Sequence, residues 1–273
     1  MESAERITFY DQHPFDWVAP DSTEAIHKVV SRPLIELIEG LVADSLVIDV
    51  GCGPGRVLSV LARRGIKCVG IDRSRVSVGL ATQRCRKPGA VGDNLRLPFA
   101  DSCADVVISD GVIHHTEDPQ AAFDENCRIL KPYGQMYLAV YKPSGRYPWL
   151  YKYPGAVIRA GLRNPLTRVL VTIFAQTPYF LVHFVRSKGR RTWAGARNLF
   201  YDYFVTPRVA FLSRDAVEHW CAKEGLRIVK YDANHGGNVH SFRLVKESTA
   251  LSRGAAASHS APEPLVAGRG VTA

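Results

Sequence analysis

The sequence lacks the cysteine patterns of metal-binding and disulfide-stabilised proteins. Its 273 residues include six cysteines, and no two of them form a Cys-x-x-Cys pair. Their irregular spacing predicts free thiols in a reducing compartment, and it favours neither a zinc site nor a redox dithiol. We therefore expect no metal. The cysteines are Cys52, Cys68, Cys85, Cys103, Cys127 and Cys221.

Long apolar runs are also missing. Residues 1–10 carry charges of both signs and no apolar stretch, which disfavours a secretory signal. The nearest approach to a membrane span is 166–185, and Arg168, Gln176, Pro178 and His183 interrupt it. No spanning helix is therefore expected, and a cytoplasmic location is the default prediction.

The two ends of the chain differ from its middle. Residues 1–45 predict a helical cap, in which an irregular stretch with Phe9, Phe15 and Trp17 precedes a helix over 22–41 that Pro33 divides. Residues 248–273 are mostly Ala, Ser, Gly and Pro with little to bury, and they predict a disordered tail.

Between positions 46 and 141, short apolar runs alternate with helical segments. The runs at 46–50, 67–72, 89–91, 105–109 and 135–141 resemble strands buried on both faces of a parallel sheet. Helices are expected over 56–64, 74–86 and 119–129. This alternation predicts a doubly wound α/β, Rossmann-like core, which a helix and two strands over 213–247 would close.

A glycine-rich turn follows the first predicted strand. Gly51, Gly53 and Gly55 permit positive φ and let a ligand approach the start of the next helix. Such a turn alone does not separate a dinucleotide from S-adenosylmethionine, because both present an adenosine and an anionic group.

Three acids separate the two ligands. Asp49, two residues before the first glycine, would repel a pyrophosphate but could pair with the ammonium group of an amino acid. Asp72 ends the second strand, where it could accept hydrogen bonds from ribose hydroxyls. Asp93 follows the third strand and could receive an adenine amino group, with Asn94 and the backbone of Leu95 alongside.

These segments, in this order, resemble the class I S-adenosylmethionine-dependent methyltransferases. Residues 47–55, 69–74 and 92–99 resemble their first three motifs, and 128–135 resembles the run before strand five, with Tyr133 where glycine is usual. Residues 105–115 with Asp118-Pro119 are similar to the ubiquinone/menaquinone-type branch, methyltransferase type 11. The resemblance covers residues 45–141, about a third of the chain. It implies a seven-stranded, mostly parallel sheet with an antiparallel last strand.

The resemblance also implies S-adenosylmethionine as cofactor and S-adenosylhomocysteine as product. Gly51, Cys52 and Gly53 would lie under the methionine part, and Ser109 near the transferred methyl. Asp110 departs from the family pattern; it either binds cofactor or substrate or caps the following turn. The implied cofactor-binding residues are Asp49, Gly51, Cys52, Gly53, Asp72, Arg73, Asp93, Asn94, Leu95, Ser109 and Asp110.

Methyl transfer needs a base only when the acceptor must lose a proton. His114 and His115, after the fourth strand, are candidates for that base, and local packing is the alternative. His235 and His240, between the last two predicted strands, are further candidates. Tyr10 could cover the cofactor and face its sulfonium.

Residues 142–212 interrupt the strand–helix rhythm and predict a largely helical insertion that acts as a lid over the acceptor. Between 142 and 214 there are thirteen Lys or Arg and one acid, Asp202, against a net charge of +9 for the whole chain. This charge suggests an anionic or amphipathic acceptor, peripheral contact with an anionic membrane, or a solvated basic face. Nucleic acid is disfavoured because no recognisable binding module is present.

Four functions follow from these patterns. The first is a methyltransferase for a small-molecule acceptor in a biosynthetic pathway. The second is a membrane-associated methyltransferase for a lipid, quinone or prenyl- or phosphate-bearing acceptor. A non-catalytic scaffold and an oxidoreductase are disfavoured by the three acids. The sequence leaves open the acceptor atom (O, N or C), the general base and the oligomeric state.

Overall fold

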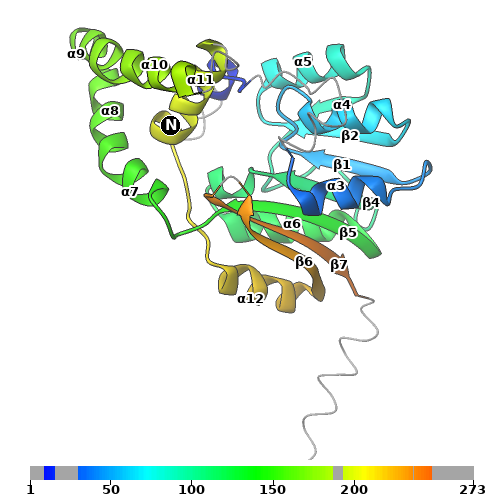
Figure 1. Ribbon diagram of the computed structural model, residues 1–273. Coiled ribbons are helices and arrows are strands. Elements are labelled where there is room, and N and C mark those ends of the chain that lie inside the picture. The colour runs from blue at the N-terminus through cyan, green and yellow to red at the C-terminus, as the bar shows by residue number, and fades with distance from the viewer. Residues whose placement is uncertain (1–8, 16–29, 187–192, 236, 248–273) are drawn as a thin grey trace, which may run out of the picture.

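The computed structural model describes residues 9–15, 30–186, 193–235 and 237–247 (Figure 1). Trp17, the first half of the helix predicted over 22–41 and the predicted tail over 248–273 lie outside the described residues. The description therefore covers the core and most of the insertion.

The core is a single sheet of seven strands in the order β3-β2-β1-β4-β5-β7-β6. Strand β7 is antiparallel to both β5 and β6, and the remaining pairs are parallel. This confirms the predicted fold class. The strands are β1 (Leu46–Val50), β2 (Lys67–Asp72), β3 (Gly89–Val91), β4 (Ala104–Asp110), β5 (Leu130–Tyr141), β6 (Leu226–His235) and β7 (Val239–Lys246).

Helices cover both faces of this sheet. Val47 and Ile48 are neighbours on β1 but belong to different hydrophobic clusters, because successive side chains of a strand point to opposite faces. One cluster includes Phe123 of α6 and Trp220 of α12, and the other includes Leu37 of α3. The helices are α3 (Arg32–Glu39), α4 (Arg56–Arg63), α5 (Arg75–Cys85), α6 (Pro119–Ile129) and α12 (Arg214–Glu224).

Pro33 lies in the first turn of α3, which starts at Arg32, and the part of the predicted run before position 30 lies outside the described residues. The Ser31 side chain accepts a hydrogen bond from the Leu34 N–H at 3.3 Å and caps the helix start. Proline is tolerated in a first turn because that N–H has no intrahelical partner to lose.

Strand β5 begins five residues before the predicted start at Gln135. Ala104 of β4 pairs with Leu130, and the register then shifts so that Val106 pairs with Gln135. The extra residues form a bulge in which Tyr133 has φ +61°. The glycine usual at this position of the family would adopt that conformation without strain.

The insertion is largely helical in its described part, between non-helical segments at 142–146 and 206–212, and Figure 1 shows it as an arm that leaves β5 and returns to α12. Four aromatic and small side chains, Phe180, Ala196, Phe200 and Phe204, form its own buried cluster. Its elements are α7 (Tyr147–Lys152), α8 (Pro154–Arg163), α9 (Pro165–Val171), the π-helical turn η2 (Thr172–Gln176), α10 (Thr177–Arg186), α11 (Trp193–Phe200) and the π-helical turn η3 (Tyr201–Val205).

The polar residues and Pro178 that interrupt the apolar run over 166–185 do not end the helix there. Residues Pro165–Arg186 form one 22-residue helix, long and apolar enough to cross a membrane by length and composition. The π-helical turn η2 directly precedes Pro178 and widens the helix where proline cannot donate. The Thr177 hydroxyl donates to the carbonyl of Thr172 at 2.9 Å and satisfies a carbonyl in this region.

The insertion meets the sheet at a narrow base. The Leu212 N–H donates to the carbonyl of Tyr141 at 2.8 Å, and the Lys142 N–H donates to the carbonyl of Asn238 at 3.0 Å. The Asn238 side chain also donates to the Tyr203 hydroxyl at 2.6 Å. The first and last residues of the insertion are therefore tied to adjacent strands.

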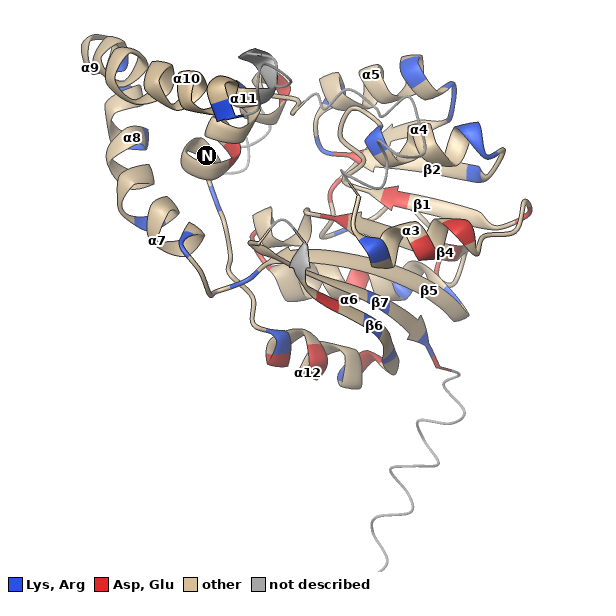
Figure 2. Cartoon of the chain, in the orientation of Figure 1, with Lys and Arg blue, Asp and Glu red and all other residues tan. Residues whose placement is uncertain are grey.

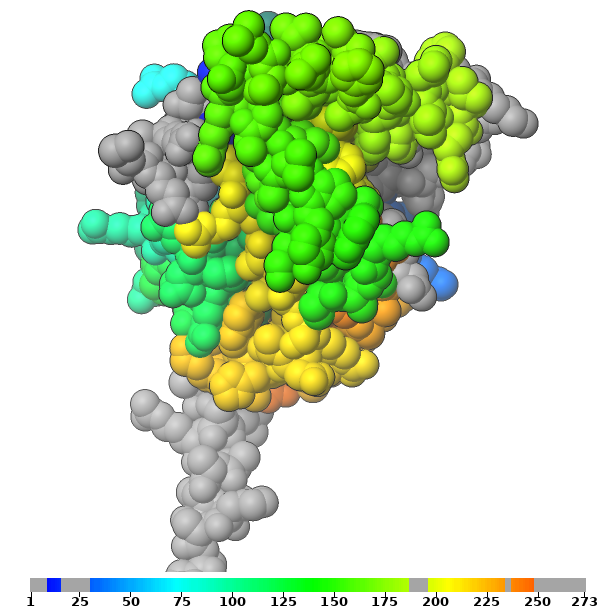
Figure 3. Space-filling model, turned by 90° about the vertical axis from the view of Figure 1, so that its left-hand side faces the viewer, coloured from blue at the N-terminus to red at the C-terminus, as the bar shows by residue number. Residues whose placement is uncertain are grey.

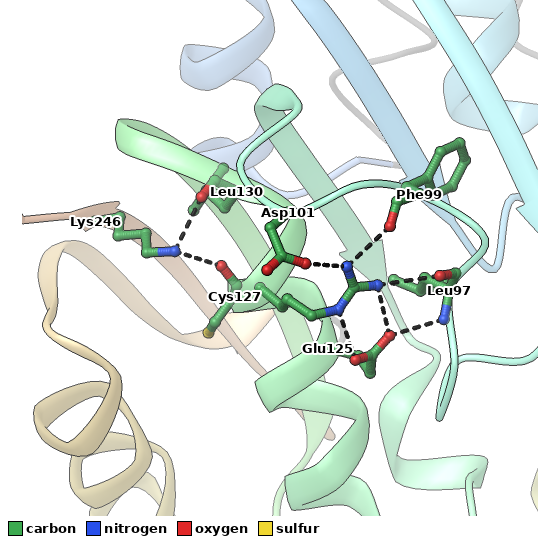
Figure 4. A network of polar contacts seen from close by, with 8 residues as sticks. Leu97, Phe99, Asp101, Glu125, Cys127, Leu130 and Lys246 are labelled. Carbon is green, nitrogen blue, oxygen red and sulfur yellow. Dashed lines mark hydrogen bonds and ion pairs between the residues drawn. The ribbon is translucent and has the colours of Figure 1, made fainter.

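A network centred on Arg128 holds the segment that follows Asp93 (Figure 4). Arg128 forms ion pairs with Glu125 at 2.8 Å and Asp101 at 2.6 Å, and it donates to the carbonyls of Leu97 and Phe99. Charge-assisted bonds to both sides of a loop fix its path. The network therefore secures the loop between β3 and β4 against α6.

Candidate active site

A cavity of about 380 Å³ lies where the first five strands end. Residues at or just beyond the carboxyl ends of these strands line it, which is where open α/β sheets bind ligands. The N-terminal segment adds Tyr10 and Phe15, and the insertion adds Asp202 and Thr206. The strand-end residues are Gly51, Arg73, Gly92, Gly111 and Tyr141.

The glycine turn is shaped by the backbone at Gly51. Its φ is +75°, and a Cβ at this position would lie 2.4 Å from the Val112 side chain. Its N–H donates to the carbonyl of Ile71 at 2.7 Å, which ties the turn to β2. The turn thus brings bare backbone to the cavity wall, as the sequence predicted for a closely approaching ligand.

Asp49 lines the cavity as a buried carboxyl group. It is 2% exposed, and its Oδ2 atom has no hydrogen-bond partner among the described residues. Burial, followed by the nearby charges of Asp110 and Asp72, raises its pKa to about 8. A cationic group of a ligand would stabilise the ionised form of this carboxyl.

Asp72 accepts from two backbone N–H groups, of Gly53 and of Ser74, each at 2.8 Å. These bonds lower its pKa, but burial dominates and raises it. The carboxylate therefore stands fixed at the end of β2, between the glycine turn and α5.

Asp93 forms an ion pair with Arg73 at 3.2 Å and accepts from the Leu95 N–H at 3.1 Å. Arg73, Asp93 and Asn94 line the cavity. The Leu95 side chain instead packs against the core. The predicted adenine-side residues thus reach the cavity through Asp93 and Asn94.

Asp110 forms an ion pair with Arg56, and both side chains line the cavity. Asp110 was predicted either to bind cofactor or substrate or to cap the following turn. Because its side chain lines the cavity, this arrangement favours the role in binding. It also places a second negative charge near Asp49.

The structure separates the two adjacent histidines. His115 lines the cavity, and its Nδ1 donates to the carbonyl of Arg208 at 2.8 Å, which leaves Nε2 as an acceptor in the neutral ring. Burial lowers its pKa to about 4. His114 is fully buried and does not line the cavity; its ring lies 4.2 Å from that of Tyr141. A catalytic role for His114 is therefore disfavoured.

Ser109 is fully buried on β4 and does not line the cavity. His240 accepts or donates a 2.6 Å hydrogen bond with the Tyr231 hydroxyl on the neighbouring strand, also away from the cavity. The side chain of His235 lies outside the described residues. Tyr10 does reach the cavity, and its ring lies 6.3 Å from that of His115.

The sequence did not predict the contact between Tyr141 and Asp202. The Tyr141 hydroxyl donates to Asp202 Oδ2 at 2.7 Å, and both residues line the cavity. Burial raises the pKa of Asp202 to about 6. One signal was available: Asp202 is the only acid in a strongly basic insertion.

Residues 48–138 match a family model described as a methyltransferase domain, of the type 11 family. The chain is 41% identical over 101 residues to the probable tRNA methyltransferase 9B of Homo sapiens, covering 36% of this chain and 21% of that protein. It is 32% identical over 117 residues to a tRNA (carboxymethyluridine(34)-5-O)-methyltransferase of Mus musculus, covering 42% of this chain and 17% of that protein. The chain thus spans about a fifth of the length of these relatives.

Solved structures share the fold. A magnesium protoporphyrin IX methyltransferase from Synechocystis PCC 6803 with bound S-adenosylhomocysteine matches with a TM-score of 0.55 at 15% identity, over 90% of this chain and 100% of that one. A methyltransferase from Methanosarcina mazei matches with a TM-score of 0.52 at 18% identity, over 80% of this chain and 98% of that one.

The sheet order and the domain match together identify residues 48–138 as a methyltransferase domain, with the fold of the solved S-adenosylmethionine-dependent methyltransferases. The match to the type 11 family covers residues 48–138, about a third of the chain.

Proposed function

We propose that the protein transfers a methyl group from S-adenosylmethionine to a small-molecule acceptor in a biosynthetic pathway. One observation carries the proposal. A single cavity is lined on one side by the acids of the glycine-turn region and on the other by Tyr141 and Asp202, at the base of the insertion 142–212. Donor and acceptor would meet in that cavity, with the insertion as lid.

The residues of the donor side fit the cofactor. The unpartnered, buried carboxyl of Asp49 suits the ammonium group of a methionine moiety. Asp72 suits the ribose hydroxyls, and Asp93 and Asn94 suit the adenine. When bound, S-adenosylmethionine supplies an electrophilic methyl group on a sulfonium.

The acceptor side offers two proton acceptors. The Nε2 atom of His115 is the acceptor of a ring whose tautomer the Arg208 carbonyl fixes. Asp202 carries a carboxyl whose pKa of about 6 allows it to be ionised near neutral pH. The aromatic rings of Tyr10 and Phe15 would exclude water from the same space. In-line transfer then depends mainly on alignment of the two reactants.

Calorimetric titration with S-adenosylhomocysteine tests the donor site, and NADH serves as the matched control ligand. We expect micromolar binding of S-adenosylhomocysteine and none of NADH. Binding of NADH alone would support an oxidoreductase, and binding of neither would support a scaffold. A screen with methyl-labelled S-adenosylmethionine against hydroxyl, amine and carbon acceptors would then identify the acceptor atom.

A membrane-associated form of this function is the second candidate. The observation that favours it is the 22-residue apolar helix Pro165–Arg186, in which only 11% of the most apolar 18-residue window is buried. Its acceptor would be a lipid, a quinone or a prenyl- or phosphate-bearing molecule, and the protein would be cytoplasmic with peripheral membrane contact.

Two relatives are named as tRNA methyltransferases, so RNA is a further acceptor to test. A gel-shift titration with unfractionated tRNA checks this: submicromolar binding at physiological salt would favour an RNA acceptor over a small molecule.

A further inference from the structure

The helix formed by α9, η2 and α10 packs on the protein along one stripe. Tyr179 lies 5.4 Å from the ring of Phe200 and 5.7 Å from that of Phe204, and Phe180 lies 6.0 Å from Phe200. Gln176 is buried on the same side. These contacts hold the helix against α11 and η3.

The opposite stripe of this helix is apolar and exposed. Its members recur every three or four residues, and each is at least half exposed, from 52% at Ile173 to 81% at Leu166. A helix that packs by one stripe and faces water with the other normally carries polar residues there. The exposed apolar residues are Leu166, Val169, Leu170, Ile173, Phe174, Leu181, Val182 and Val185.

The exposed apolar surface continues onto α7 and α8. Val157 is 73% exposed, and Trp149 and Tyr153 are 58% and 53% exposed. Figure 3 shows α7 to α10, in green, spread over one face of the molecule. Tryptophan and tyrosine beside an apolar stripe are typical of the boundary between water and lipid.

The charge of this region has one sign. Positions 142–201 contain eleven Lys or Arg and no Asp or Glu, and Figure 2 shows blue but no red on α7 to α10. Arg163 and Arg186 lie at the ends of these helices, whereas the guanidinium groups of Arg159 and Arg168 donate to backbone carbonyls within the insertion. A basic segment with an apolar stripe suits the surface of a bilayer that contains anionic lipids.

We propose that the exposed stripe of α9–η2–α10 docks in the plane of a phospholipid membrane. Arg163 and Arg186 would then bind the anionic headgroups. The proposal rests on the membrane-associated form of the proposed function. The helix is about 33 Å long, which is enough to span a bilayer. However, its packed stripe stays on α11 and η3, so the helix lies along the membrane surface.

The same charge argues against a second copy of the chain as the occupant of this surface. Two copies joined through these stripes would bring together eleven cations from each, with no acid in positions 142–201 to pair with them. A bilayer supplies the missing negative charge in its headgroups.

Vesicle co-sedimentation of the full chain tests the proposal. The vesicles are phosphatidylcholine, with and without phosphatidylglycerol. The test variant is Leu166→Glu with Phe174→Glu. The matched control is Val42→Glu with Val229→Glu. It makes the same charge change at exposed apolar residues outside the insertion, which are 69% and 39% exposed.

We expect the wild type and the control to bind anionic vesicles, on the order of tenfold more weakly without phosphatidylglycerol. The test variant should bind about a hundredfold more weakly, because two apolar side chains no longer enter the lipid. Equal binding of test and control variants would overturn the proposal. The proposal would also be overturned if the wild type formed a dimer in solution and bound no vesicles, and if the test variant were a monomer.

Binding of S-adenosylhomocysteine by each variant separates this proposal from the proposed function. If vesicle binding fails while S-adenosylhomocysteine still binds, the docking surface is wrong and the donor site stands. If the ligand fails to bind while vesicles do, the docking surface stands and methyl transfer does not.

Discussion

At the residue scale, the carboxyl group of Asp49 occupies a site that water hardly reaches, with no partner for Oδ2 among the described residues. Because its pKa is raised from 3.8 to about 8 in the folded chain, its contribution to stability is present below pH 4. That contribution is lost as the pH rises through 8. A bound ammonium group reverses this effect, since it favours the ionised carboxylate.

Asp49→Asn should therefore weaken binding of S-adenosylhomocysteine by about 10- to 100-fold, the usual worth of a hydrogen bond to a charged group. In the wild type the affinity should rise as the pH rises toward 8, because binding requires the proton to leave. The variant should lose this pH dependence. Calorimetry across that range measures both effects, with the exposed Asp44→Asn as control. An unchanged affinity would contradict the assignment of Asp49.

Asp202→Asn should reduce methyl transfer by about 10²- to 10⁴-fold if Asp202 accepts the acceptor's proton, while S-adenosylhomocysteine binding stays unchanged. The Asn carbonyl can still accept from Tyr141, so the insertion keeps its contact. Tyr141→Phe is the informative partner variant, because loss of its hydrogen bond should move the pH profile of kcat/KM upward. Wild-type turnover in Asp202→Asn would exclude Asp202 as the base.

The Tyr141–Asp202 contact is a long-range contact that local sequence patterns do not predict. The donor-side acids could be predicted because each stands at a fixed place after a strand. Asp202 stands 61 positions from Tyr141, and no local periodicity links the two. Only the path of the insertion brings them together.

At the element scale, Tyr133 holds a left-handed backbone conformation within β5. Tyr133→Gly should stabilise the protein by about 0.5–1 kcal/mol, because a side chain that is 67% exposed contributes little packing and glycine relieves the strain. Urea unfolding measures the gain. Tyr133→Ala is the control: it removes the ring but keeps Cβ, so a similar gain in both variants would show that strain is not the cause.

The first three strands were predicted with the bounds that the structure shows, because strands buried on both faces appear in the sequence as short apolar runs. The start of β5 was not, since its bulge depends on the register with β4. A largely helical insertion was predicted, but the bounds of its helix Pro165–Arg186 were not. Its proline is accommodated by a π-helical turn that no composition rule anticipates.

At the scale of the whole molecule, the core and the insertion differ in the size of their buried clusters. The sheet is packed by two large clusters, whereas the insertion has four buried residues of its own. Local opening is easiest where few apolar contacts are buried. Backbone amides of α8 to α10 should therefore exchange with deuterium faster than those of β1 and β4.

Hydrogen-exchange mass spectrometry checks this prediction. S-adenosylhomocysteine should slow exchange around 49–53 and 72–74 and leave α9 unaffected, whereas anionic vesicles should slow exchange in α9 and α10. Equal protection of insertion and core in the free protein would contradict the difference in packing.

The narrow base of the insertion has an evolutionary consequence. The Leu212 N–H forms a hydrogen bond with the carbonyl of Tyr141, so the first and last residues of the insertion 142–212 lie close together at the edge of the sheet. A segment with such close ends can be lengthened, shortened or exchanged without moving the strands beneath it. Arms from other proteins with this fold could therefore be transplanted at these two positions, and we expect the acceptor to change while the methyl donor stays the same.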